Sequence, residues 1–337
     1  MTTIQVRRGA DFARIMGVGC HRPERVVSNA EICTMMESSD EWIRERSGIV
    51  ERRWAAPDES VVDMGVIAAR EAIAAAGINP ELIGTVICAT VTHPFQTPSA
   101  SVEIADRIGA TNAGSTDLSS ACAGFAYGIG IADSLVRCGQ SDYVLVVGVE
   151  KLTDFVDASD RSTGFIFADG AGAAVVGPSD IPAIGPTIWG GDGSQTEAIV
   201  LEPDFVTHRR LLAEDPNTPW PRLQMQGQAV FRWAVGEMPR VATAALGAAG
   251  LTVNDIDVFI PHQANMRITD AMVRALKLPD SVVVARDIAT TGNTSGASIP
   301  LAMRRMLDAG EIHSGQTALL IGFGAGLAYA AQVVTIP

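Results

Sequence analysis

The chain has 337 residues, of which 47% are hydrophobic and 19% charged, so it can bury a large core and is not a disordered protein. Its formal net charge of -13 argues against nucleic acid or an anionic membrane as the main partner. The five cysteines form no CxxC pair, which argues against a disulfide framework or a metal site and favours a reducing cytoplasm.

Neither end of the chain carries a membrane signal. Residues 1–9 lack the apolar segment of a signal peptide. The longest nearly apolar run, Ala318 to Ala331, covers 14 residues with three glycines, which is too short to span a bilayer. We therefore predict a soluble protein and read this run as a buried strand–turn–strand.

The first third of the chain alternates between helix and strand patterns. Ser28 with Glu31, and Ser38 with Glu41, are capping-box pairs that predict helices over 29–37 and over a short segment ending near Gly48. Further helices are predicted over 61–76 and 101–108, with a strand over 85–90 between them. This alternation predicts an α/β fold.

The middle of the chain predicts two central strands, over 143–149 and 169–177. Residues 179–221 are rich in proline and glycine and read as linker and loop. A helix over 227–249, a strand over 258–260 and a helix over 266–277 follow.

The second half of the sequence repeats the first at low identity. Residues 75–87 align without a gap with 248–260, and 122–139 align with 293–310. We expect two related α/β halves, residues 1–178 and 179–337, packed about a pseudo-dyad. In that alignment Cys122 and Asn293 occupy the same place, so both would approach one centre, at the strand ends where α/β sheets place their sites.

Cys122 is the candidate nucleophile. It stands among small residues before an uncharged run that predicts a buried helix. The N-terminus of a helix favours an anion and lowers a thiol pKa, and the thiolate is the reactive form of cysteine. A structural cysteine on a glycine-packed core helix is the alternative for this residue considered alone.

His262 and Asn293 have alternatives too. His262 follows the strand over 258–260 and could simply cap a strand-to-helix turn, while Asn293 lies in a Gly-Asn sequence that favours turns. The glycine-rich segment 322–326 lies too near the C-terminus to open a dinucleotide-binding βαβ unit. Together, however, cysteine, histidine and asparagine supply a nucleophile and two hydrogen-bond donors.

The chain resembles the β-ketoacyl-[acyl-carrier-protein] synthase III family of the thiolase superfamily over nearly its whole length. The segments that carry the resemblance are 38–43, 121–125, 168–172, 261–265, 292–295 and 322–326. The resemblance implies a thiolase-like fold, with two pseudo-symmetric halves in αβαβα layers, and no cofactor or metal besides the coenzyme A thioester substrate. A Cys-His-Asn set points to the priming enzyme, since related thiolases use a second cysteine and elongating synthases use two histidines.

The resemblance also implies a mechanism. Cys122 would attack an acyl-coenzyme A primer, and its own N–H together with that of Gly324 or Ala325 would stabilise the oxyanion. Malonyl-acyl carrier protein would then enter. His262 and Asn293 would donate to its thioester carbonyl during decarboxylation, beside Phe323.

Two binding surfaces follow. The resemblance implies a coenzyme A site of Trp42, Arg46, Ser47, Arg161, Gln228 and Asn265, with Gln228 in place of an expected asparagine. An acidic carrier protein needs a local basic surface on so acidic an enzyme. We place it at Arg232, Gln263, Arg267, Arg274 and Lys277; Arg267 and Arg274 lie within about 20° of each other on the helix.

The primer is less defined by sequence. Thr97 stands where family members restricted to acetyl primers carry a bulky phenylalanine, so branched or longer primers would fit. In the family this loop reaches the neighbouring subunit, so the resemblance implies a homodimer.

Three alternatives remain open at this stage. A priming ketosynthase of a polyketide pathway would use the same chemistry with another starter. A papain-type hydrolase also uses Cys, His and Asn in that order, although its cysteine lies near the mature N-terminus, whereas an α/β segment precedes Cys122. A non-catalytic interaction protein would not need the intact set.

Overall fold

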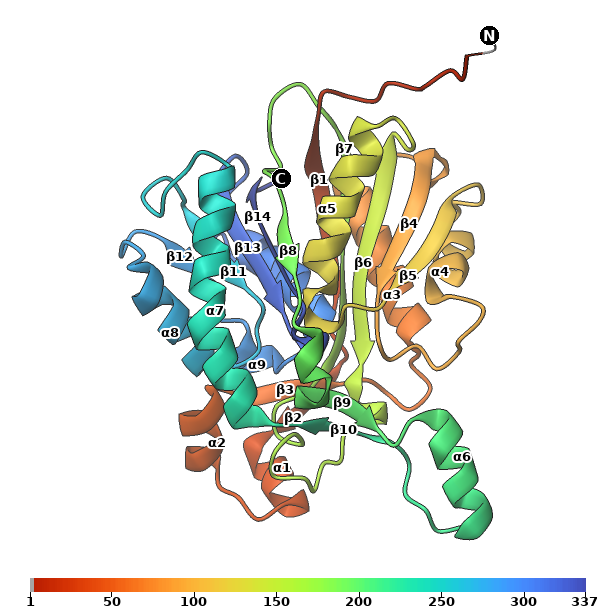
Figure 1. Ribbon diagram of the computed structural model, residues 1–337, viewed down its shortest axis with the longest axis vertical. Coiled ribbons are helices and arrows are strands. Elements are labelled where there is room, and N and C mark those ends of the chain that lie inside the picture. The colour runs from red at the N-terminus through yellow and green to blue at the C-terminus, as the bar shows by residue number, and fades with distance from the viewer. Residues whose placement is uncertain (1–2) are drawn as a thin grey trace.

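The computed structural model describes residues 3–337, which form two five-stranded sheets separated by a layer of helices (Figure 1). The first sheet has the order β1 (Phe12–His21), β7 (Asp169–Ser179), β6 (Tyr143–Lys151), β4 (Ile83–Ala89) and β5 (Gly114–Leu118). The second has the order β8 (Ile188–Gly190), β14 (Tyr329–Thr335), β13 (Thr317–Phe323), β11 (Val258–Pro261) and β12 (Val283–Val284).

The two sheets have the same topology. In each, the first three strands pair antiparallel and the last three pair parallel, so β6 corresponds to β13 and β4 to β11. Two helices, α5 (Gly124–Arg137) and α10 (Ser298–Asp308), pack between the sheets. The repeat seen in the sequence is thus a repeat of structure.

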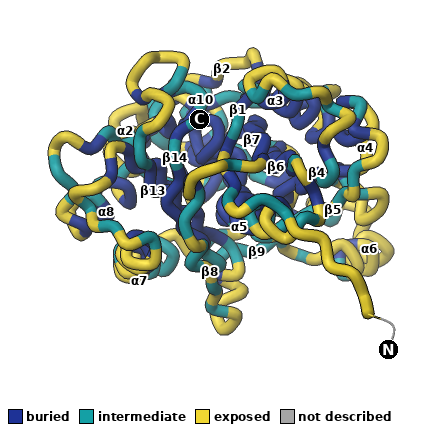
Figure 2. The backbone as a smooth tube through the Cα atoms, turned by 90° about the horizontal axis from the view of Figure 1, so that it is seen from above, coloured by how far each residue is buried: buried dark blue, intermediate teal, exposed yellow. Residues whose placement is uncertain are grey.

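Helices cover the outer face of each sheet. On the first sheet lie α3 (Val61–Ala76) and α4 (Ala100–Ile108); the second is covered by α7 (Gly227–Ala248), which packs beside α8 (Met266–Leu276). The resulting order is the predicted αβαβα. Figure 2 shows the buried residues concentrated in the strands and the central helices.

Local sequence explains most element boundaries. Ser60 and Asp63 cap the start of α3 reciprocally, and Gly77 ends it in the left-handed conformation. The predicted run over 318–331 is β13, a turn and β14, as expected. One cap was misplaced: Ser39, and not Ser38, accepts from the Trp42 amide at the start of α2 (Asp40–Ser47).

The segment expected to be linker contains regular structure. It forms β8, β9 (Ile199–Glu202) and α6 (Phe205–Glu214), and β9 pairs with β10 (Arg222–Met225). These elements were not predicted because each is too short to show a clear hydrophobic periodicity, and the surrounding proline and glycine residues are typical of loops. A smaller cluster at this end of the molecule packs α1 (Asn29–Met35), α2, β2 (Arg25–Ser28) and β3 (Glu51–Trp54) beside α9 (Ile288–Thr291).

In the part of the chain that the structure describes, no helix is long and apolar enough to cross a membrane.

Candidate active site

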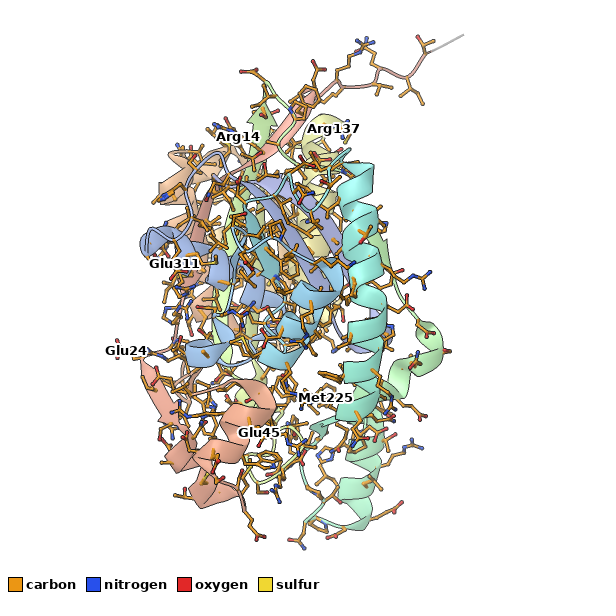
Figure 3. The ribbon with its side chains drawn as sticks, turned by 90° about the vertical axis from the view of Figure 1, so that its left-hand side faces the viewer. Arg14, Glu24, Glu45, Arg137, Met225 and Glu311 are labelled. Carbon is orange, nitrogen blue, oxygen red and sulfur yellow. The ribbon has the colours of Figure 1, made fainter. Side chains whose placement is uncertain are left out.

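A cavity of about 890 Å³ brings together the three residues singled out by chemistry, Cys122, His262 and Asn293. It opens at the end of the molecule where α2 and the start of α7 face each other. Figure 3 shows this end with Glu45 on α2 and Met225 just before α7. Most of its lining is apolar, from Phe155, Leu201, Leu223 and their neighbours.

Cys122 lies in a 3₁₀ turn, residues 121–123, that leads directly into α5. The preceding Ala121 has φ 44, a left-handed conformation that costs energy in a residue with a Cβ. Burial raises the pKa of the Cys122 thiol to about 12, although the Ser295 hydroxyl acts against this shift. The thiol is therefore neutral in the free enzyme, despite its position before a helix.

Gly324 lies directly against the nucleophile. A Cβ at this position would stand 2.9 Å from Cys122 Sγ and 3.2 Å from its backbone nitrogen, so only glycine fits. The Gly324 N–H donates to the Ala328 carbonyl over 2.9 Å. Ala325 begins the next 3₁₀ turn, where an N–H has no acceptor within the turn.

His262 follows β11 and is 2% exposed. Its Nδ1 lies 2.7 Å from Ser298 Oγ, and that oxygen also accepts from the Gln263 amide over 3.3 Å. With Ser298 donating to Nδ1, the imidazole proton resides on Nε2. Burial lowers the pKa of His262 to about 3, so the ring is a neutral hydrogen-bond donor rather than a base at neutral pH.

Asn293 is oriented by its neighbours. Its Oδ1 accepts from the Ser295 amide over 2.8 Å, which leaves its Nδ2 hydrogens as donors. Its backbone exchanges hydrogen bonds with Ile166 and Ala168. Phe323, at the end of β13, packs edge to face with His262 at 5.4 Å between centroids.

The predicted coenzyme A residues are gathered at the mouth of the cavity with one exception. Trp42, Arg46, Arg161, Gln228 and Asn265 all line it. The Arg161 guanidinium lies 4.7 Å from the Trp42 ring centroid, so an inserted adenine would have to displace it. Ser47 is the exception. It is fully buried and its hydroxyl donates to the Ile43 carbonyl, because successive helical residues point about 100° apart.

The predicted basic surface also needs one correction. Arg232, Arg267, Arg274 and Lys277 are exposed, and Arg267 stacks on Phe231 at 5.2 Å. Gln263, however, is 1% exposed and bonds to the Pro261 carbonyl and the Ile288 amide. It positions the loop after β11 and is not available to a carrier protein. Thr97 is exposed and does not line the cavity of its own chain.

Sequence reasoning missed two polar residues beside the nucleophile, Glu150 and Ser295. Glu150 is completely buried at the end of β6, and Ser295 donates to its Oε1 over 3.1 Å. The available signal was a lone carboxylate directly after the uninterrupted apolar run over 143–149.

Comparison with known proteins agrees with this geometry. A family model of 3-oxoacyl-[acyl-carrier-protein] synthase III matches residues 116–193. A second model, of the C-terminal part of the same enzyme, matches residues 246–336. Beta-ketoacyl-[acyl-carrier-protein] synthase III 1 of Streptomyces coelicolor is 54% identical, with all of both chains covered. The chain belongs to the 3-oxoacyl-[acyl-carrier-protein] synthase III family.

Solved structures similar to this chain share its fold. The priming beta-ketosynthase of the R1128 polyketide pathway is 48% identical and superposes with a TM-score of 0.95, over 100% of this chain and 99% of that one. The synthase III of Aquifex aeolicus is 34% identical with a TM-score of 0.88, over 96% and 100%. Membership of a family of condensing enzymes makes this chain an acyltransferase.

Proposed function

We propose that this enzyme condenses an acyl-coenzyme A primer with malonyl-acyl carrier protein, with loss of carbon dioxide, to give 3-oxoacyl-acyl carrier protein. The observation that carries the proposal is the convergence of a cysteine and two oriented donors in one largely apolar cavity. This reaction is the first condensation of fatty acid synthesis. It needs no metal or cofactor, since the thioesters supply the reactive groups.

In the first half-reaction Cys122 Sγ attacks the primer carbonyl and coenzyme A leaves as its thiol. The developing oxyanion needs two N–H donors near the sulfur. The Cys122 amide supplies one. Of the two candidates for the other, Ala325 is favoured, because the Gly324 amide already donates to Ala328.

In the second half-reaction His262 and Asn293 act on the malonyl thioester. Nε2–H and Nδ2–H donate to its carbonyl oxygen as carbon dioxide departs and charge develops there. The enolate carbon then attacks the acyl group on Cys122 and expels the thiol. Phe323 contributes an apolar wall that disfavours the malonyl carboxylate before it is lost.

Partner and compartment are part of the proposal. Arg232 and Arg267 at the cavity mouth, with Arg274 and Lys277, would attract an acidic carrier protein. The family resemblance implies a homodimer in which this loop reaches the neighbouring subunit, and both Phe95 and Thr97 are exposed and lie outside the cavity of their own chain. Five free cysteines favour the cytoplasm.

Intact-protein mass after incubation with acetyl-coenzyme A tests the proposal. A stable acetyl adduct, discharged by malonyl-acyl carrier protein to give the 3-oxoacyl product, is expected. Release of acetate without an adduct would indicate a hydrolase, and no reaction would indicate a binding protein.

A second candidate function is priming of a polyketide pathway, favoured by the similarity to the R1128 ketosynthase. A panel of acetyl, propionyl, isobutyryl and hexanoyl primers, each offered with carrier proteins of both pathways, separates the two.

A further inference from the structure

The reaction requires Cys122 to lose a proton, yet its surroundings offer no ordinary base. His262 is neutral and its Nδ1 is engaged by Ser298. Burial keeps the thiol protonated. The nearest polar side chain on the facing turn is that of Ser295, which lines the same cavity as Cys122 and opposes the rise in the pKa of its thiol.

Behind Ser295 lies Glu150, a carboxylate whose two oxygens have unequal surroundings. Oε2 accepts from three donors: Thr92 Oγ1 at 2.7 Å, the Val91 amide at 3.1 Å and Thr90 Oγ1 at 3.3 Å. Oε1 faces only the Ser295 hydroxyl. A proton arriving at Glu150 would therefore be held on Oε1, toward Ser295, without displacing another hydrogen bond.

The backbone around these residues is built to bring them together. Ser295 has φ 49, the counterpart of the strained Ala121 beside Cys122. Gly148, on the same strand as Glu150, lets the Ser295 turn approach, since a Cβ there would lie 2.3 Å from the Gly296 carbonyl oxygen. Strained backbone and a glycine contact maintained around a buried polar pair indicate a functional arrangement rather than an accident of packing.

We propose that Ser295 and Glu150 form a proton relay for Cys122, with Glu150 as a positioning residue that acts through Ser295. As sulfur attacks the primer, its proton passes to Ser295 Oγ while the Ser295 proton moves to Glu150 Oε1. The carbon–sulfur bond to coenzyme A then breaks, and its thiolate takes a proton back through the same relay. The enzyme's charge is unchanged, and the inference rests on the proposed acylation of Cys122.

The other charged and titratable groups near Glu150 leave it suited to this role. Cys122 has a pKa raised by burial, and the Glu150 charge adds to this rise. Cys88 on β4 packs with Val147 and Val149 on the opposite face of the sheet, and its pKa is raised by burial, then by Asp117 and Glu150. Lys151 directs its ammonium away, to the carbonyls of Ala56 and Pro57. Burial raises the pKa of Glu150 to about 7, so this carboxyl group changes its protonation state near neutral pH.

The test compares Glu150→Gln and Ser295→Ala with the native chain. The matched control is Asp169→Asn, which neutralises another fully buried carboxylate, on β7, outside the cavity. Two rates are followed by mass spectrometry of the Cys122 peptide from about pH 5 to about pH 9: acetylation by acetyl-coenzyme A and alkylation by iodoacetamide.

The relay predicts that native acetylation rises through about pH 7 and then levels off, as Glu150 ionises. Glu150→Gln and Ser295→Ala should each lose about 10²-fold in acetylation near neutral pH and show a rate that keeps rising with pH. Alkylation should slow in both variants as well, while their malonyl decarboxylation stays near the native rate. The control Asp169→Asn should keep near-native rates of acetylation and alkylation. Ser295→Ala keeps the backbone N–H that holds Asn293.

A merely electrostatic role predicts the opposite sign. Removing the Glu150 charge would then make the thiol more acidic and speed alkylation, and that outcome overturns the relay. If Glu150→Gln fails to fold, Ser295→Ala decides alone, and native acetylation in that variant also overturns it. If no coenzyme A thioester acylates the native chain, the proposed function fails, while the alkylation profile still decides the relay.

Discussion

The two halves of the molecule use one backbone frame for different chemistry. Gly148 on β6 admits the turn of the second half, and Gly322 on β13 admits the turn of the first, where a Cβ would lie 2.9 Å from the Ala123 Cα. Two positions further on, Gly324 leaves bare backbone beside Cys122, whereas Glu150 places a carboxylate beside Ser295. The backbone arrangement is therefore symmetric, but the equivalent positions 324 and 150 carry different residues. Gly324 makes room for the nucleophile, whereas Glu150 supplies the proposed proton acceptor.

The comparison corrects the sequence alignment of the halves. Ala121 and Ser295 both have a left-handed backbone conformation, and they are as far apart in sequence as Gly148 and Gly322. Cys122 therefore corresponds to Gly296, and Asn293 comes earlier. The alignment matched the ends of the two helices, but α10 has 11 residues and α5 has 14, so it misplaces their beginnings.

The largest expected effect tests the division of labour between the halves. Cys122→Ala should abolish acyl transfer from coenzyme A, because no other thiol faces the Gly324 backbone. Malonyl decarboxylation should persist in part, since its two donors come from the second half. Peptide mapping of acetylated native protein checks the site. Acylation at Cys88 or Cys138, or condensation by the variant, would contradict the assignment.

The converse variants should show the reverse pattern. His262→Ala and Asn293→Ala should still form acyl-enzyme but lose about 10²–10³-fold in malonyl decarboxylation, because each removes one donor to the developing oxyanion. Single-turnover acylation and release of labelled carbon dioxide measure the two steps separately. Loss of acylation with decarboxylation intact would make His262 the base for Cys122 and replace the relay.

The third prediction concerns the frame itself. Gly148→Ala forces a Cβ to within 2.3 Å of a backbone oxygen in the other half, so it should reduce the free energy of unfolding by about 1–3 kcal/mol. Gly236→Ala is the control, since it lies in α7 with nothing within 4 Å of the added carbon. It should increase that free energy by about 0.5–1 kcal/mol. Equal denaturant midpoints for the two variants would mean that the close approach of the two halves at Gly148 does not contribute to stability.

Much of this arrangement could be predicted from sequence, and the failures have physical causes. The layered fold, Cys122, His262 and Asn293 follow from local patterns and a family resemblance. Ser47 and Gln263 were misassigned because neighbours in sequence point to different sides of the chain. Glu150 was missed because its role depends on a contact with Ser295, which lies far away in sequence. The division at residue 178 stays a prediction.

The fourth prediction concerns the exposed loop around Thr97, which in a homodimer would reach the primer pocket of the second subunit. Thr97→Phe should raise the ratio of kcat/KM for acetyl over isobutyryl primers by about tenfold. The added ring would fill part of the primer pocket, and a difference of one methyl group in such a pocket changes kcat/KM by about this much. Competition between the two primers measures the ratio. Gln96→Phe, one residue earlier on the same exposed loop, is the control. An unchanged ratio for Thr97→Phe would place the gate elsewhere.

The smallest expected effect belongs to the rim. Arg267 is exposed at the cavity mouth on Phe231, and it should speed arrival of an acidic carrier protein without touching the reacting atoms. Arg267→Glu should lower kcat/KM for malonyl-acyl carrier protein about tenfold at low salt and less at high salt, because salt screens exposed charges. Acetylation of Cys122 by acetyl-coenzyme A should change little. Arg240→Glu makes the same charge change on an exposed part of α7 outside the cavity lining, so it controls for net charge. Equal losses in the two variants would show that only the overall charge matters, and equal loss of both half-reactions in Arg267→Glu would indicate a structural role for this residue.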